Sequence, residues 1–308
     1  MPVAVITGAS KGLGRALAAA LAARGWDLVV DARSAGPLEE AARELRGTGV
    51  RVVALPGDVT DRGHRAALVA AAGALGGLDL LVNNASVLGA EPLARLADHP
   101  LDGLRAALEV NVVAPLGLVQ EALPLLRDSS YLPSYEEVLP YIGNTPYGED
   151  VGNGATYESH PYIENDRNAG SSDSPAFGAV SDTTIGAKGT FARAGGAVLN
   201  ISSDAAVEAY PAWGGYGATK AALDQQSAVL AVEEPGLRVW WVDPGDMRTD
   251  LYAAAVPDED TSGRPLPGTV VPGLLRLLDD QAPSGRYHAA AGAGPSDGAP
   301  ASEGAGSR

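Results

Sequence analysis

The sequence predicts a doubly wound α/β fold with a seven-stranded parallel sheet. Short β-branched runs alternate with Ala/Leu/Arg-rich helical stretches from residue 3 to 127, and the alternation resumes at residue 196. A glycine-rich turn joins the first of these runs to the first helical stretch. Strands that alternate with helices of about 10–15 residues are typical of βαβ units, whose right-handed crossovers place successive strands parallel.

The N-terminal part supplies the first strands and helices in strict alternation. The predicted strands are Val3–Thr7, Asp27–Asp31, Val50–Leu55 and Leu78–Asn83, and the predicted helices are Leu13–Arg24, Pro37–Arg46 and Asp61–Leu75. A longer helix follows over Asp102–Arg127. The C-terminal part is predicted to form the strands Ala197–Ile201, Leu237–Val242 and Arg286–His288 and the helices Gly214–Val232 and Gly268–Leu278.

Residues 128–190 interrupt this alternation with a different composition. They carry ten acidic and two basic side chains and six of the ten tyrosines. Removing these 63 of 308 positions leaves 245 and joins a helix to a strand through an ordinary short connection. We interpret them as an insertion of unknown structure into one domain, 1–127 and 191–288. The Ala/Gly/Ser/Pro stretch 289–308 is predicted to be a disordered tail.

The charge balance limits the classes of partner. Lys and Arg number 22 against 38 Asp and Glu, which gives a net charge of −16 and opposes binding to nucleic acid or anionic membranes. The chain has no cysteine, which excludes thiolate catalysis, and its four histidines are dispersed, so no metal site is expected. With no signal-peptide character before the first strand, a cytoplasmic location is expected.

The glycine-rich turn predicts a dinucleotide site. Gly8, Gly12 and Gly14 lie between a strand and an Ala-rich helix. A pyrophosphate needs close backbone N–H groups and the positive end of a helix dipole, and glycine permits both the tight turn and the approach.

The residues at the end of the second strand determine which cofactor is preferred. An acid there can bind the ribose 2′-hydroxyl of NAD(H), and a cation can bind the 2′-phosphate of NADP(H). The sequence offers both, as Asp31 and Arg33. Because Lys11 adds a second cation, we expect NADP(H) to be preferred.

Tyr216 and Lys220 form a candidate acid–base pair. Four residues apart in a predicted helix, their side chains share one face. A neighbouring ammonium would lower the pKa of the phenol and let it exchange a proton with a carbonyl oxygen. Ser203 follows a buried parallel strand at its carboxyl end, where the sites of open α/β sheets form, and can bond the same oxygen.

Together these residues resemble the short-chain dehydrogenase/reductase superfamily, which has the Rossmann fold. The matching motifs are Thr7-Gly8-x-x-x-Gly12-x-Gly14, Asp58, Asn83-Asn84-Ala85, Asn111, Ser203, Tyr216-x-x-x-Lys220 and Pro244-Gly245-x-x-x-Thr249. They cover the chain outside the insertion and the tail. Ser86 departs from the pattern, because that family usually has glycine after Asn-Asn-Ala.

The resemblance implies a role for each matching residue. Tyr216 would be the general acid/base, Lys220 would lower its pKa and hold the nicotinamide ribose, and Ser203 would orient the substrate. Asn111 would anchor a water-linked proton relay to Lys220. The implied cofactor-binding residues are Thr7, Gly8, Ser10, Lys11, Gly12, Leu13, Gly14, Arg33, Asp58, Val59, Asn84, Ala85, Tyr216, Lys220, Pro244, Gly245 and Thr249.

Two functions are therefore considered. The first is an NADP(H)-dependent oxidoreductase that acts on a small carbonyl or secondary alcohol, with an apolar or aromatic pocket from Val87–Leu93, Tyr210, Trp213 and Tyr252. The resemblance implies a homodimer or homotetramer. The alternative is a nucleotide-sensing protein that engages a partner through its acidic, Tyr-rich insertion.

Overall fold

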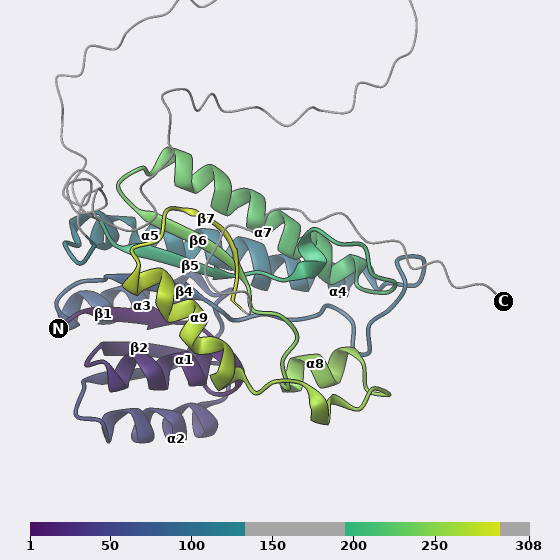
Figure 1. Ribbon diagram of the computed structural model, residues 1–308, viewed down its shortest axis with the longest axis horizontal. Helices are drawn as coiled ribbons and strands as arrows, with labels where there is room; N and C mark the ends of the chain where they lie inside the picture. Colours follow the sequence, from purple (N-terminus) through teal and green to yellow (C-terminus); the bar gives the residue numbers. More distant parts are fainter. Residues whose placement is uncertain (133–194, 290–308) are drawn as a thin grey trace, which may run out of the picture. The chain divides into compact units, whose positions relative to one another are not determined.

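The strands form one parallel sheet, as predicted. The structure is a computed structural model, and it describes residues 1–132 and 195–289. Within these residues the strand order is β3-β2-β1-β4-β5-β6-β7, and every neighbouring pair is parallel (Figure 1). The strands are β1 (Val3–Ile6), β2 (Asp27–Ala32), β3 (Val52–Pro56), β4 (Leu80–Asn83), β5 (Ala197–Ile201), β6 (Arg238–Asp243) and β7 (Gly285–His288).

Helices cover both faces of the sheet. One face carries α1 (Gly12–Ala23), α2 (Ala35–Arg46) and α9 (Pro267–Asp279), and the other carries α3 (Arg62–Leu75), α5 (Ala114–Asp128) and α7 (Gly214–Glu233) (Figure 1). Alternate residues of β1 belong to different cores, with Ala4 and Ile6 facing the first layer and Val3 and Val5 the second. Strands buried on both faces read as continuous apolar runs, which is why they were predictable.

The topology places the functional edge. The chain passes from β1 outward to β2 and β3, and then crosses to β4 on the other side of β1. The order therefore reverses between β1 and β4. In open parallel sheets ligands bind outside the carboxyl ends of the strands at this reversal, where the loops after neighbouring strands diverge.

The long helix predicted over Asp102–Arg127 contains an irregular turn. It consists of α4 (Leu101–Leu108), a π-helical turn η1 (Glu109–Val113) and α5. Among the described residues, Leu101–Asp128 is the one helix long and apolar enough to cross a membrane by length and composition. However, 44% of its most apolar window is buried inside the protein, and Leu118, Ala122 and Leu126 belong to the core beside the sheet.

Three short elements were not predicted from the sequence. These are the helix α8 (Asp250–Ala255) and the 3₁₀ turns η2 (Asp204–Ala206) and η3 (Thr261–Gly263). Each has its N-cap side chain bonded to a backbone N–H, from Thr249, Ser203 and Asp260 respectively. Such one-turn elements depend on local capping and have too few residues for a periodic pattern.

Most of the expected insertion and nearly all of the expected tail lie outside the described residues. The first residues after α5 are described, and they pack on the domain. Leu132 is buried, and the Tyr131 ring meets that of Trp26 edge-on at 4.7 Å between centroids. The alternative function through the insertion concerns residues that the structure does not describe beyond Leu132.

Candidate active site

The glycine turn after β1 has the shape that the sequence predicts. Gly8 and Gly12 have φ values of +67° and +58°, a region that favours glycine. A Cβ on Gly14 would lie 2.6 Å from the Gly8 carbonyl oxygen and 2.5 Å from Asn84 Nδ2. Gly14 therefore has no room for a side chain. The free N–H groups and the dipole at the start of α1 favour an anion.

Two polar side chains hold this turn against β4. Thr7 Oγ1 accepts from the backbone N–H groups of Asn84 and Ala85, both at 3.0 Å. Asn84 Nδ2 donates to the carbonyl oxygens of Thr7 at 2.8 Å and Gly8 at 3.2 Å. The Asn84 amide group, which the resemblance assigns to the cofactor backbone, is therefore bonded to the glycine turn itself.

The acid and the cation at the end of β2 have different environments. Asp31 is 1% exposed, and its carboxylate accepts from Gly8 N at 2.8 Å and pairs with His64 Nε2 at 3.0 Å. Arg33 is exposed and lines the large cleft near Asp58. Asp58 Oδ1 accepts from the N–H and hydroxyl of Thr60, and these bonds hold the pKa of Asp58 below its ordinary value.

Lys11 pairs with a carboxylate from a later element of the chain. Its Nζ lies 2.7 Å from Asp250 Oδ2 at the start of α8, and the two side chains are 69% and 75% exposed. The sequence reasoning placed Lys11 near the phosphate that Arg33 would bind. In the structure Lys11 lines the same cleft as Arg33 and pairs with Asp250, a carboxylate that the sequence gave no reason to place there.

Tyr216 and Lys220 lie on one face of α7, as their spacing predicts. Lys220 Nζ is 5.5 Å from the centroid of the Tyr216 ring. Both side chains are buried, with 6% and 2% exposure. Lys220 Nζ donates to the carbonyl oxygen of Ile201 at 2.7 Å, at the end of β5. Burial lowers the pKa of Lys220 to about 8, although the Asp224 carboxylate opposes this shift.

The pKa of Tyr216 moves opposite to the expectation. Burial raises it well above its ordinary value, and the carboxylates Asp243 and Asp204 raise it further. A hydrogen bond with Ser86 opposes this shift. We expected the Lys220 ammonium to lower this pKa, but that ammonium donates to the backbone of Ile201. The phenol is therefore held in its protonated form.

Ser203 is placed by neighbours on both sides. Its Oγ donates to Asp204 Oδ1 at 2.9 Å and accepts from Ala205 N at 3.2 Å. Its carbonyl oxygen accepts from Arg286 Nη2 at 2.9 Å, and Arg286 Nε lies 3.0 Å from Asp224 Oδ2. Sequence reasoning missed Arg286 and Asp224, which are 62 residues apart and belong to no motif.

Asn111 lies in the π turn with its side-chain amide fully engaged. Its Nδ2 donates to Val87 O at 2.8 Å and to Thr219 Oγ1 at 2.9 Å. Its Oδ1 accepts from Val87 N at 2.9 Å and from Ser86 Oγ at 3.2 Å. The side chain thus ties the loop after β4 to α7. Its hydrogen bonds do not include Lys220, and the water-linked relay that the resemblance implies stays a prediction.

The loop after β6 completes the site. Gly245 has a φ of +71°, and its N–H donates to Asp243 Oδ1 at 2.8 Å. Burial raises the pKa of Asp243, while its bond from Gly245 and the nearby His288 oppose the rise. Thr249 caps α8, where its Oγ1 accepts from Tyr252 N at 3.2 Å.

One cleft of about 1030 Å³ joins these loops at the carboxyl edge of the sheet. Of the predicted site residues, it is lined by Gly8, Ser10, Lys11, Gly12, Leu13, Arg33, Asp58, Val59, Asn84, Ala85, Ser203, Tyr216, Lys220, Pro244, Gly245 and Thr249. Thr7, Gly14 and Asn111 are not on its wall. They support residues that are, through the bonds and close approaches described above.

The end of the cleft beyond Tyr216 is aromatic. The Trp213 ring lies 5.8 Å from that of Tyr216 and 6.3 Å from that of Tyr252, between centroids. Leu88 and Leu251 line the same cleft. Tyr210, also expected here, is not among the residues that line the cleft; its hydroxyl lies 2.7 Å from Glu208 Oε2 and 3.1 Å from Asp204 Oδ2.

Comparison with known proteins places these features in a family. The family model described as "short chain dehydrogenase" matches residues 2–131 and 175–260. A glycine betaine reductase of Emericella nidulans is 28% identical over 260 residues, which cover 83% of this chain and 15% of that protein. A hydroxyacyl-CoA dehydrogenase of Mycobacterium tuberculosis is 36% identical over 133 residues, 42% of this chain and 41% of that one. The chain thus spans less than half the length of either relative.

Solved structures share the fold. A short chain dehydrogenase from Shigella flexneri, complexed with NADP, superposes with a TM-score of 0.69 at 22% identity, over 94% of this chain and 97% of that one. An alcohol dehydrogenase from Thermococcus sibiricus, complexed with 5-hydroxy-NADP, gives a TM-score of 0.66 at 22% identity, over 94% and 95%. At this identity the likeness concerns the fold alone.

Proposed function

The chain belongs to the short chain dehydrogenase family, and from that premise we propose that it is an NADP(H)-dependent reductase of small carbonyl compounds. The observation that carries the proposal is the single cleft that joins the glycine turn to Tyr216 and Lys220. When bound there, the nicotinamide supplies hydride chemistry. The residues of this chain supply the binding surface and the proton.

The glycine turn fits a dinucleotide. Backbone N–H groups at the start of α1 would bind the pyrophosphate, because Gly8, Gly12 and Gly14 leave the approach free of side chains. Asp58 and Val59 would lie along the adenine, and Thr249 would lie by the carboxamide at the other end of the cleft. These assignments follow the family resemblance, and their positions on the cleft wall support them.

The preference for NADP(H) rests on Arg33. Its guanidinium is exposed at the end of β2, where it can pair with a 2′-phosphate. The carboxylate of Asp31 is engaged by Gly8 and His64. At 1% exposure it is poorly placed to accept from a ribose 2′-hydroxyl, and the exposed guanidinium favours the phosphate.

Tyr216 would act as the general acid. Burial raises the pKa of its phenol, so the group carries its proton at neutral pH and can give it to a carbonyl oxygen. Ser203 would donate to the same oxygen by turning its hydroxyl away from Asp204. The ammonium of Lys220 would stabilise the phenolate that forms and hold the nicotinamide ribose. This arrangement favours carbonyl reduction near neutral pH.

The substrate would be an apolar or aromatic carbonyl compound. Trp213, Tyr252, Leu88 and Leu251 surround the end of the cleft beyond Tyr216. Large apolar side chains with a few converging polar groups are typical of small-molecule sites. The acyl-CoA and betaine chemistry named for the relatives belongs to those proteins.

The test is a panel of aldehydes and ketones, aliphatic and aromatic, assayed by NADPH oxidation and in parallel with NADH. We expect NADPH-dependent reduction, fastest for apolar or aromatic carbonyls. Tyr216→Phe should retain NADPH binding while turnover falls by at least about 10²-fold, the usual contribution of an acid–base group. Unchanged turnover in Tyr216→Phe would remove the phenol from the mechanism.

A further inference from the structure

Asp31 is a buried carboxylate for which the proposed chemistry has no role. It lies near the end of β2, is 1% exposed and lines the cleft together with Gly8. Its Oδ1 accepts from Gly8 N at 2.8 Å, and its backbone carbonyl oxygen accepts from Ala9 N at 2.8 Å. Asp31 therefore holds the first two residues of the glycine turn from the neighbouring strand.

His64 binds the second oxygen of this carboxylate. Its Nε2 lies 3.0 Å from Asp31 Oδ2, and its side chain is 11% exposed. An ionised carboxylate only accepts hydrogen bonds, so Nε2 carries the proton of this bond. His64 belongs to no motif of the glycine turn and comes from the first turn of α3.

Two neighbours place the imidazole of His64. Asp61 Oδ1 caps α3 by accepting from His64 N at 3.0 Å, which fixes where the helix begins. Gly57 leaves the space that the ring occupies, because a Cβ on Gly57 would lie 2.3 Å from His64 Nδ1. The donor to Asp31 is therefore held by the start of α3 and by the loop after β3.

The glycine turn is bound from both strands that flank β1. From β2 it is bound by Asp31, and from the loop after β4 Asn84 Nδ2 donates to the carbonyl oxygen of Gly8 at 3.2 Å. The N–H groups of Gly8 and Ala9 are both engaged by Asp31. The pyrophosphate would therefore be bound by the N–H groups that follow them, whose positions depend on Gly8.

A buried carboxylate keeps its place only while its oxygens are bonded. Without the N–H of His64, the charge of Asp31 would turn towards water or take up a proton. In either case the bond from Gly8 N would weaken, and the turn would lose its attachment to β2.

We propose that His64 is a positioning residue for the dinucleotide. Its Nε2–H fixes Asp31, and Asp31 fixes the start of the glycine turn so that the following N–H groups face the pyrophosphate. The proposal rests on the dinucleotide site of the proposed function. Because NADPH and NADH share the pyrophosphate, His64 should contribute equally to both, whereas Arg33 would contact the 2′-phosphate alone.

The experiment measures the Kd of NADPH and of NADH by nicotinamide fluorescence, with the full chain as wild type, His64→Leu and His64→Gln. In His64→Leu both Kd values should rise by about fivefold or more, because a bond to a charged group is lost. His64→Gln restores a side-chain N–H donor and should recover most of the affinity. Loss of affinity in both variants would assign the role to packing of the ring and overturn the proposal.

The effect should be confined to cofactor binding. In the carbonyl assay, KM for NADPH should rise with Kd in His64→Leu, while kcat at saturating NADPH stays within about twofold of the wild type. This is expected because the pyrophosphate is bound alike in the ground state and the transition state. A rise for NADPH alone would place the effect at the 2′-phosphate and contradict the proposal.

Ser129→Ala is the matched control, because Asp79 has the same arrangement at the amino end of β1. One oxygen of Asp79 accepts from Val3 N at 2.7 Å, and the other accepts from Ser129 Oγ at 2.7 Å. Ser129 is also buried, and neither residue lines the cleft. Its removal should leave both Kd values unchanged.

A second measurement follows the turn without cofactor. In hydrogen exchange followed by mass spectrometry, the peptide that covers residues 7–14 should exchange faster in His64→Leu than in the wild type and His64→Gln. Peptides from β6 and α9 should exchange alike in all three, which shows that the variant is folded. Equal exchange of residues 7–14 in all three chains would overturn the proposal.

These outcomes are separable from those of the proposed function. A carbonyl panel without activity would remove the reductase function, but the Kd values would still test His64. Equal Kd values in the wild type and His64→Leu overturn the role of His64, whatever the panel shows. A wild-type chain that binds neither cofactor overturns both.

Discussion

At the scale of single residues, the site depends on which polar groups are already engaged. Asp31 lies at a position where an acid would favour NAD(H), but its oxygens are bonded to Gly8 and His64. Arg33, two residues on, is exposed on the cleft wall. The proposed preference for NADP(H) therefore rests on the exposure of Arg33 and the burial of Asp31.

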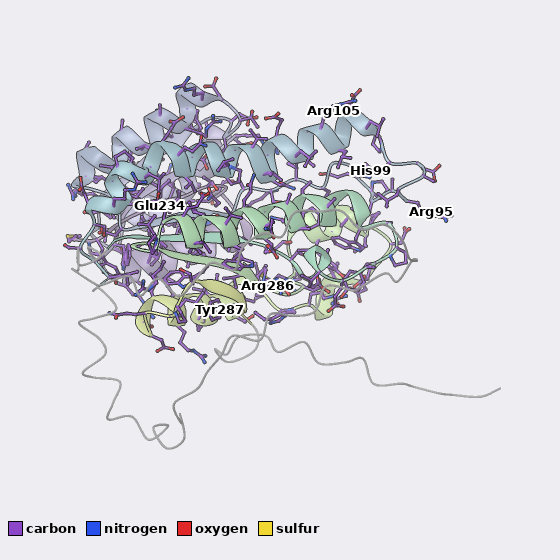
Figure 2. The ribbon with its side chains drawn as sticks, turned by 90° about the horizontal axis from the view of Figure 1, so that it is seen from above. Arg95, His99, Arg105, Glu234, Arg286 and Tyr287 are labelled. Atoms are coloured by element: carbon purple, nitrogen blue, oxygen red, sulfur yellow. The ribbon has the colours of Figure 1, made fainter. Side chains whose placement is uncertain are left out.

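We expect Arg33→Ala to weaken NADPH selectively. A charge-assisted contact to a phosphate contributes about 1.5–3 kcal/mol, so KM for NADPH should rise by about tenfold or more while KM for NADH changes little. Steady-state kinetics with both cofactors measure this. Arg105→Ala is the control, because Arg105 is exposed on α4 (Figure 2) and its one ion pair among the described residues is with Asp102. An equal rise for both cofactors would contradict the assignment of Arg33 to the 2′-phosphate.

The lowered pKa of Lys220 makes the free energy of unfolding depend on pH. Burial lowers its pKa from 10.5 to about 8 in the folded protein. Between these values the unfolded chain binds a proton that the folded chain does not, so this group makes stability rise with pH from about pH 8 upward. The gain should be on the order of 2 kcal/mol by about pH 9.5, since each pKa unit corresponds to about 1.4 kcal/mol.

Urea unfolding of the wild type and Lys220→Met at pH 7 and pH 9.5 isolates this effect. The two proteins share every other titrating group. The free energy of unfolding of the wild type, relative to that of Lys220→Met, should therefore be larger at pH 9.5 than at pH 7. A difference that is independent of pH would show that Lys220 does not lose its proton in this range.

At the scale of elements, the active site is held by contacts between strands and helices that are distant in the sequence. Arg286 on β7 bonds Asp224 on α7 and the carbonyl oxygen of Ser203 after β5. Ser202 Oγ donates to the second oxygen of Asp224. This cluster fixes the start of η2, where the Ser203 hydroxyl must point into the cleft.

Removing the Arg286 cation should destabilise this cluster. Burial raises the pKa of Asp224, and Arg286→Ala would leave that carboxylate without its cation, at a cost of about 2–3 kcal/mol. Turnover should also fall, because Ser203 loses its backbone anchor. Urea denaturation measures the first effect. Arg286→Ala combined with Asp224→Asn should recover part of the lost stability. No recovery would indicate that Arg286 acts by packing alone.

Sequence reasoning found the elements and the wall of the cleft for a physical reason. Strands buried on both faces are apolar runs, and parallel strands bring their carboxyl ends to one edge, so residues after Ile6, Asn83 and Ile201 must meet there. Side-chain directions are different. The bond from Lys220 to Ile201 depends on where α7 lies over β5, which no local pattern records.

At the scale of the whole molecule, the described segments that flank residues 133–194 come together in the domain. Gly196 N donates to the carbonyl oxygen of Leu126 at 2.8 Å, so the end of α5 and the start of β5 are direct neighbours. Ala197 N continues this register with a bond to the carbonyl oxygen of Asp79. The seven strands of the sheet and the cleft residues named above all belong to the described segments on either side.

We therefore expect a chain in which residues 133–194 are replaced by a short glycine-rich linker to fold and to reduce the same carbonyls. Its kcat and KM should stay within about threefold of the full chain, because every predicted site residue lies outside the deletion. Circular dichroism and the carbonyl assay check this, with the full chain as the control. An insoluble or inactive product would assign these residues a role in the domain. The expected homodimer or homotetramer stays a prediction, which light scattering of both chains would test.

The π turn at Glu109–Val113 has a consequence for the angular phase of the long helix. A π turn behaves as an α-helix with one residue added, and each residue advances the helix by about 100°. The turn therefore sets the angle between the buried Ala107 of α4 and the stripe of Leu118, Ala122 and Leu126 on α5. Deleting one residue from the turn would rotate this stripe away from the core while leaving the composition nearly unchanged. The number of residues between Leu108 and Ala114 therefore matters to this fold as much as their chemical type.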